Sequence, residues 1–101
     1  MESTCDLIRK VMSKDTLGYP IATETKVTVL CNVRTVSRQE FFDAGKAGLV
    51  PQYEIRINAI EYDGEDELEY NGKRYGIYRT YQADDYISLY VEYKGGLSDG
   101  Q

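Results

Sequence analysis

The C-terminal half of the chain consists of short alternating segments separated by tight-turn residues, and this pattern restricts the fold to antiparallel β structure. Asn71-Gly72 is the strongest turn signal, because both residues tolerate the positive φ angles of a two-residue hairpin. Asp63-Gly64 and Asp84-Asp85 mark two further turns. The segments between these turns are therefore expected to pair as neighbouring antiparallel strands.

About six strands and one helix are expected in total. The predicted strands cover about residues 5–13, 26–35, 53–62, 67–70, 73–82 and 86–94. Residues 14–25 contain Gly18, Pro20 and several threonines, and they predict a loop. A six-stranded sheet in so short a chain tends to curl, which removes exposed edges. The predicted fold is mainly β: a small antiparallel β-barrel or sandwich with one short helix inserted after the second strand.

The inserted helix has clear start and stop signals. Ser37 and Glu40 form a capping-box pattern, in which the serine hydroxyl accepts from the N–H of Glu40 and the glutamate reaches back to the N–H of Ser37. The helix is expected to end near residue 47, and Pro51 prevents it from resuming. Phe41 and Phe42 lie about 100° apart on a helix, so only one can point squarely at the sheet. The other is expected to face solvent or a partner.

The length of 101 residues indicates one domain, predicted to span residues 1–94 and to be followed by a flexible Gly-rich tail, residues 95–101. No apolar run is long enough to cross a membrane, and the N-terminus lacks the basic and apolar pattern of a signal peptide, so a cytoplasmic product is expected. Cys5 and Cys31 are widely spaced and predict two reduced structural thiols, with a disulfide as the less favoured alternative.

The composition argues against an enzyme, a metal protein or a nucleic-acid reader. The chain has no histidine, which removes the common catalytic bases and the commonest zinc ligand. Its net charge of −5 disfavours tight binding to phosphate backbones. The acidic run in residues 61–69 lacks the spacing of a calcium-binding loop and predicts a solvated hairpin tip, although a weak surface cation site stays open. No catalytic residue, cofactor or metal ligand is therefore expected.

Three segments together carry a resemblance to a known family. They are DTLGYPIATETK (residues 15–26), VSRQEFFDAGKAGLVPQYEIRI (36–57) and YDGEDELEYNGKRYGIYRTYQADDYISLYVEYK (62–94). An aliphatic-Ser-x-x-Glu start, an aromatic pair, a small-residue run and a return strand opening with an aromatic resemble the head-tail joining, or head-closure, proteins of tailed bacteriophages and prophages. The family fold implied by this resemblance is a small β-barrel with a helix or loop insert.

The resemblance also implies a function in virion assembly. Several copies would form a ring between the portal and the tail, and DNA would pass through its channel without specific binding. The chain would act in the virion, after assembly in the bacterial host cytoplasm, with portal or adaptor and tail proteins as partners and no membrane. Stopper, adaptor and tail-side joining roles stay open, as do the ring's copy number and whether the isolated chain is monomeric.

Two sets of residues are expected to make the contacts of such a ring. The insert, residues 36–51, would face the channel, and its interaction residues would be Ser37, Arg38, Glu40, Phe41, Phe42, Gly45, Gly48, Leu49 and Val50. The predicted loop would reach a neighbouring ring through Asp15, Leu17, Gly18, Tyr19 and Pro20. Two aromatic and two aliphatic side chains in or beside one short helix exceed what capping a core requires.

A second hypothesis comes from the tyrosines. Tyr70, Tyr75, Tyr78, Tyr81, Tyr86, Tyr90 and Tyr93 either pack across strands and between subunits or form one stacking face. In the latter case the chain would be a small β-barrel module that binds a ligand or carbohydrate. Arg34, Arg38, Arg56, Arg74 and Arg79 would either form ion pairs between subunits or solvate the outer strand faces.

Overall fold

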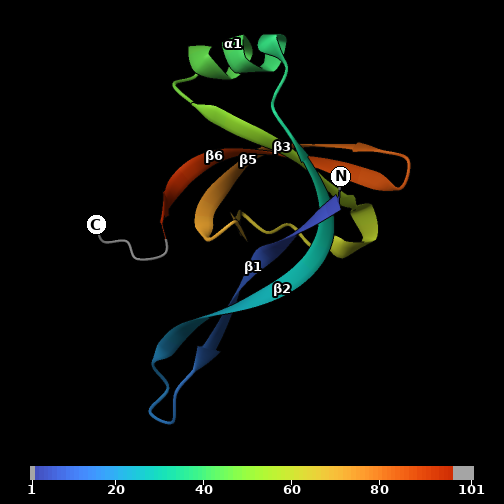
Figure 1. The fold of residues 1–101 in the computed structure, drawn as a ribbon. Coiled ribbons are helices and arrows are strands. Elements are labelled where there is room, and N and C mark those ends of the chain that lie inside the picture. Colours follow the sequence, from blue (N-terminus) through green and yellow to red (C-terminus); the bar gives the residue numbers. More distant parts are fainter. Residues whose placement is uncertain (1, 97–101) are drawn as a thin grey trace.

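Six antiparallel strands close into a barrel in the computed structural model, which describes residues 2–96 (Figure 1). The order around the barrel is β1-β2-β3-β6-β5-β4. The strands are β1 (Glu2–Lys14), β2 (Pro20–Arg34), β3 (Pro51–Asn58), β4 (Glu67–Tyr70), β5 (Lys73–Ala83) and β6 (Tyr86–Gly96). One helix, α1 (Arg38–Lys46), follows β2, and one 3-10 turn, η1 (Ala59–Glu61), follows β3. The predicted fold class is confirmed.

The barrel core is built from every second residue of its strands. Ile55 and Ile57 of β3 lie opposite Leu89 and Ile87 of β6, and all four are at most 6% exposed. This alternation is the physical basis of the strand pattern in the sequence, because successive side chains point to opposite faces of a strand. The same core contains Cys5, Leu7, Val29, Cys31, Leu68, Tyr75 and Val91.

Two of the three predicted turns join paired strands, whereas Asp63-Gly64 lies between β3 and β4, which do not pair with each other. Tyr70 pairs with Lys73 across Asn71-Gly72, whose φ angles are 57° and 76°. Ala83 pairs with Tyr86, and Asp84 has a φ of 57°. The positive φ angles of both Asn71 and Gly72 match the right-handed twist of the flanking strands, which is why Asn-Gly is a strong turn signal.

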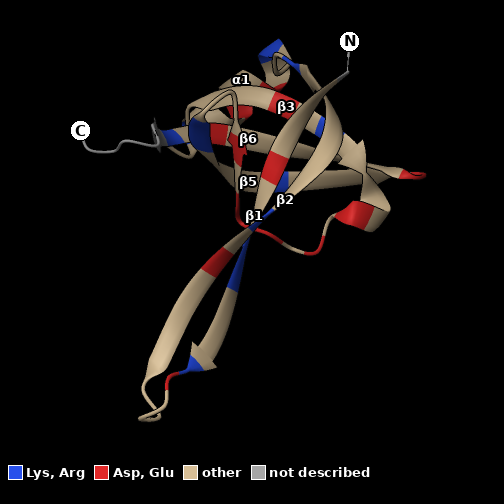
Figure 2. Ribbon diagram, turned by 60° about the horizontal axis from the view of Figure 1, so that its bottom comes forward, with Lys and Arg blue, Asp and Glu red and all other residues tan. Residues whose placement is uncertain are grey.

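The two longest strands extend well beyond the barrel. β1 and β2 pair along their whole length, from Glu2 opposite Asn32 to Lys14 opposite Pro20. Only residues 6–8 of β1 also pair with β4, and only residues 32–34 of β2 also pair with β3. Residues 9–25, here named the arm, therefore project as a two-stranded ribbon, which gives the molecule a length of 51 Å (Figures 1 and 2).

The arm corrects the prediction of a loop over residues 14–25. Strand β2 already begins at Pro20, so only residues 15–19 connect the two strands. The β-branched residues Ile21, Thr23 and Thr25 favour extended backbone. Their alternation was inconspicuous because both faces of the arm are exposed and no apolar stripe is needed.

Other element boundaries also differ from those predicted. Strand β3 ends at Asn58, four residues before the predicted end, because the Asn58 side chain accepts from the N–H of Ile60 (3.4 Å) and starts η1. Strand β1 begins at Glu2 rather than near residue 5. Strand β6 includes Gly95 and Gly96, which were assigned to the tail, and residues 97–101 of that tail lie outside the described residues.

Cys5 and Cys31 are both free and buried in the core, as predicted for structural thiols. A hydrogen bond to Cys31, together with burial, raises the pKa of Cys5. Within residues 2–96, no helix has the length and apolar character needed to cross a membrane.

Candidate functional site: exposed elements at opposite ends of the barrel

The tip of the arm is a well-defined turn. The Gly18 N–H donates to the Asp15 carbonyl and the Asp15 N–H donates to the Tyr19 carbonyl, both at 3.0 Å. The Asp15 carboxylate accepts from the N–H groups of Leu17 and Tyr19, both at 2.9 Å. Gly18 has a φ of 87°, which the bulge after a three-residue loop requires and most L-residues disfavour. The predicted contact residues of the loop therefore come together in one turn, with Pro20 opening β2.

Apolar side chains are exposed along this arm. Leu17 and Tyr19 at the tip are 79% and 65% exposed. Val11, Met12 and Ile21 along the ribbon are also exposed. Within residues 2–96, this part of each strand pairs only with its partner strand in the arm. Exposed apolar groups gathered on a projecting element are typical of a surface that a partner covers.

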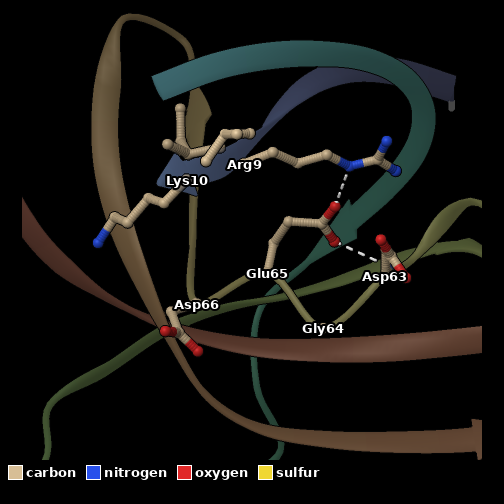
Figure 3. Close-up of a pocket in the computed structure, with 8 residues that line it drawn as sticks. Arg9, Lys10, Asp63, Gly64, Glu65 and Asp66 are labelled. Atoms are coloured by element: carbon tan, nitrogen blue, oxygen red, sulfur yellow. Dashed lines mark hydrogen bonds and ion pairs between the residues drawn. The ribbon is translucent and has the colours of Figure 1, made fainter. Parts of the chain in front are cut away.

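An ion pair between a partly exposed arginine and a buried glutamate fixes the base of the arm on one side (Figure 3). Arg9 of β1 donates through Nε to the carboxylate of Glu65, whose side chain is 2% exposed. The Asp63 N–H also donates to this carboxylate (2.9 Å), and the Tyr62 hydroxyl donates to the Glu65 carbonyl (2.8 Å). Burial acts to raise the pKa of Glu65, but the hydrogen bonds from Arg9 and the backbone outweigh it and the pKa is lowered.

The acidic segment is thus only partly the solvated tip that the sequence predicted. Glu65 and Glu69 are buried, and Glu69 pairs with Lys26 at 3.0 Å. Burial is possible because arginine and lysine side chains reach over from β1 and β2. Across the described chain, no group of three or more Asp, Glu, Cys or His side chains is placed to hold a metal ion.

Ion pairs also tie the other face of the arm base to β4 and β5. Arg74 of β5 contacts Glu24 of the arm at 3.0 Å and Glu67 of β4 at 3.1 Å. The arm is consequently anchored up to Glu24, and the freely projecting part is the segment beyond it.

Helix α1 is attached to the barrel through a polar contact that the sequence did not reveal. Ser37 caps the helix as predicted, accepting from the Glu40 N–H at 3.0 Å. The Glu40 side chain does not return to Ser37, so the second half of the predicted capping box is wrong. It accepts instead from the Tyr78 hydroxyl (2.7 Å) and from Arg79, both in β5. Arg79 in turn lies over the ring of Tyr90, 4.1 Å from its centroid.

Neither phenylalanine of the insert points into the core. Phe41 and Phe42 are 49% and 59% exposed and contact each other edge to face, with centroids 6.5 Å apart. The expectation that one of them points squarely at the sheet is wrong, because Ala44 is the buried residue of the helix and leaves no depth for an aromatic ring. Leu49, after the helix, is only partly buried.

The exposed phenylalanines border a hollow of about 580 Å³ beside the helix start. Val36, Arg38 and Pro51 line it as well. Val50 is exposed at the same end of the barrel. Of the two predicted glycines, Gly45 lies inside the helix and Gly48 follows it with a φ of 83°.

The structure brings the predicted residues into two groups rather than one site. The insert lies at one end of the barrel and the arm tip projects from the opposite end (Figure 1). Charged residues are spread over the barrel and the arm base, while the arm beyond them is mostly uncharged (Figure 2). The two sets of predicted contact residues therefore lie at separate ends of the barrel.

The tyrosines do not share one face. Tyr53, Tyr70, Tyr75 and Tyr93 form a chain of edge-to-face contacts with centroids 5.7–5.9 Å apart, and Tyr75 is buried in the core. Tyr81, Tyr86 and Tyr90 instead line a surface groove of about 460 Å³. Packing across strands is therefore the role of the first group, and only the second faces a potential ligand.

Four of the five arginines considered for subunit contacts make ion pairs within the chain. Arg34 and Arg56 both pair with Glu54, at 3.2 and 3.9 Å. The Glu54 carboxylate, at the floor of the tyrosine-lined groove, also accepts from the Ser88 hydroxyl at 2.8 Å. Burial opposes these contacts, but the pKa of Glu54 is nevertheless lowered. Arg74 and Arg79 pair with Glu24 and Glu40, while Arg38 lies beside the phenylalanines.

Comparison with known proteins adds no relative: neither the protein-family models nor the curated proteins contain a match to this chain.

Proposed function

We propose that this chain is a head-tail joining protein of a tailed phage or prophage, which assembles as a ring between the portal and the tail. The observation that carries the proposal is the pair of exposed apolar elements at opposite ends of one small barrel. A connector component must hold one neighbour above and another below, and this barrel carries an apolar contact surface at each end. The sequence resemblance supplies the identity of those neighbours.

The mechanism is mechanical rather than chemical. Barrels related by rotation contact each other head to tail around the ring, because a heterologous contact closes when the rotation divides a full turn. The arm, stiffened by the Asp15 turn, reaches the adjacent ring through Leu17 and Tyr19. No step requires a cofactor, a metal ion or a nucleophile.

In the ring, the insert would border the channel as well as contact the neighbour at its end of the barrel. A nine-residue helix is too short to be stable by itself and depends on its contacts with the barrel. The main side-chain contact that holds it is between the carboxylate of Glu40 and two donors of β5, while both phenylalanines stay exposed. Gly45 and Gly48 ease refolding to a loop or extended form. Such a segment can change conformation when a partner or DNA arrives.

Electron microscopy of reconstituted complexes tests the proposal. The genes that flank the coding sequence identify the portal, and the purified chain is mixed with portal rings from the same genome. The expected result is a ring of added density capping the portal. A chain that leaves portal and tail components untouched at high concentration contradicts the proposal.

The groove lined by Tyr81, Tyr86 and Tyr90 favours one other function, a module that binds a carbohydrate or small ligand. Exposed tyrosines stack on sugar rings and bases. The charge at the groove floor, however, is already satisfied, because Glu54 is bonded to Ser88 and to two arginines. Glycan-array binding without any portal binding is the result that would favour this module.

A further inference from the structure

Strand β2 has a long edge that the barrel does not cover. Within residues 2–96, β2 pairs with β3 only over residues 32–34, so residues 20–31 have β1 on one side and no strand on the other. The backbone groups along such an edge are ready to pair with another strand.

The turn fixes which residues point outward. The bond from the Asp15 N–H to the Tyr19 carbonyl makes these two residues a hydrogen-bonded pair. Hydrogen-bonded and non-bonded pairs alternate along an antiparallel ladder. This alternation, followed along the β1–β2 register, places Ala22, Glu24 and Lys26 in non-bonded pairs with β1. Their backbone N–H and C=O groups therefore point away from β1. Thr28 belongs to the same set.

The charges on this edge suit a second copy of the same strand. When two β2 edges pair antiparallel about a two-fold axis at Thr25, Glu24 of each copy lies opposite Lys26 of the other. Ala22 then lies opposite Thr28, so outward-pointing residues meet throughout. Moving the axis by one residue places Lys26 against Lys26 or Glu24 against Glu24, and like charges directly opposite are destabilising. One register is therefore selected and its neighbours are rejected.

Side-chain contacts already present in the chain extend this match. Lys26 is held by Glu69 and Glu24 is held by Arg74, each at 3.0 Å, so both are on one face of the ribbon and partly exposed. Across the two-fold axis, four side chains then form a row of alternating charge. The row consists of Glu69 and Lys26 of one copy followed by Glu24 and Arg74 of the second copy. A lysine on an edge strand usually prevents pairing, but here its charge is balanced in one alignment.

We propose that the free protein forms a two-fold dimer in which the β2 edges of two copies pair over residues 22–28, with Glu24 opposite Lys26 at both ends of the contact. The paired segment is about 23 Å long at ~3.3 Å per residue. Pro20, which has no N–H, stops the ladder on the tip side. The two barrels then lie at opposite ends of a four-stranded ribbon. The inference stands on the free edge and its charges and does not depend on the proposed function.

Charge reversal tests the dimer. Sedimentation velocity of the native chain up to millimolar concentration is expected to show a monomer–dimer equilibrium. Glu24→Lys and Lys26→Glu are each expected to weaken self-association about tenfold or more, because each places like charges opposite at both ends of the contact. Mixing the two variants is expected to restore a heterodimer, since every cross-axis pair in that combination is again Lys opposite Glu.

Matched controls separate this effect from a change in fold or net charge. Asp43→Lys and Lys46→Glu make the same charge changes on the exposed surface of α1, and they are expected to leave self-association unchanged. Circular dichroism establishes that each edge variant is folded before it is mixed. The mixture is informative even though Glu24 and Lys26 have partners within the chain, because those contacts are the same before and after mixing.

A second readout locates the contact. Amide exchange followed by NMR is expected to show concentration-dependent protection at residues 22, 24, 26 and 28 and none at the odd-numbered positions between them. A native chain that stays monomeric at millimolar concentration overturns the proposal. So does a dimer that both edge variants retain, or a variant mixture that forms no heterodimer.

Discussion

Glu40 in α1 accepts a 2.7 Å hydrogen bond from the hydroxyl of Tyr78 in β5, and this contact holds the insert against the barrel. Arg79 donates to the other oxygen of the same carboxylate. Burial and the neighbouring Glu40 carboxylate raise the pKa of Tyr78, so the phenol remains a donor at any physiological pH. The orientation of α1 thus depends on one carboxylate with two donors.

Replacing that carboxylate is expected to loosen the insert without unfolding the barrel. Glu40→Gln removes a charge-assisted contact of about 1.4 kcal/mol, so amides in α1 should exchange about tenfold faster. Asp43→Asn is the matched control, because Asp43 lies in the same helix and contacts only Gln39 (2.9 Å) among the described residues. Hydrogen exchange by mass spectrometry measures both variants. Equal protection of α1 in Glu40→Gln and in the native protein would contradict the role of Glu40 in holding the insert.

Acid is expected to destabilise the arm base through Glu65. The folded-state pKa of Glu65 is lowered, so its contribution to stability is complete above the unfolded pKa of about 4.3 and is lost as pH falls through the folded value. Urea denaturation between neutral pH and pH ~3 should therefore show falling stability. Glu65→Gln should flatten this dependence, whereas Glu61→Gln, at an exposed position in the preceding turn, should leave it as steep as in the native chain.

The elements that pack against one face were predictable, and those that project were not. Ile87, Leu89 and Val91 alternate in the sequence because one side of β6 is buried, and Asn71-Gly72 needs positive φ whatever surrounds it. The strand content of residues 20–25 was missed because a ribbon exposed on both faces has no apolar period to reveal it.

Long-range polar contacts were equally invisible in the sequence. Ser37 and Glu40 have the spacing of a capping box, and local spacing alone favours the return of the glutamate to the backbone. In the folded chain the Glu40 side chain instead bonds to Tyr78 and Arg79 of β5, which lie 38 and 39 residues after it in the sequence. Glu65 is a similar case, since its partner Arg9 lies 56 residues earlier.

Truncating a side chain in the core is expected to lower stability strongly, whereas truncating one at the arm tip is expected to have almost no effect. Leu89 is 0% exposed, so Leu89→Ala should lower the free energy of unfolding by about 2–5 kcal/mol. Leu17 is 79% exposed and makes no buried contact, so Leu17→Ala should change stability by less than about 0.5 kcal/mol. Chemical denaturation of the two variants measures the difference. A large loss for Leu17→Ala would mean that the tip packs against the barrel after all.

Removing the apolar side chains at one end of the barrel should abolish contact with only one neighbour. Leu17→Ser with Tyr19→Ser alters the arm tip, and Phe41→Ser with Phe42→Ser alters the insert; both pairs are exposed, so the barrel should stay folded. When portal rings and the tail component are both supplied in the reconstitution, one double variant is expected to lose the portal contact and the other the tail-side contact, because the two surfaces are at opposite ends. Ile60→Ser, which removes an apolar group that is 88% exposed elsewhere, is the matched control and should retain both contacts. If both double variants assemble as the native chain does, these surfaces are not the ones that join the neighbouring components.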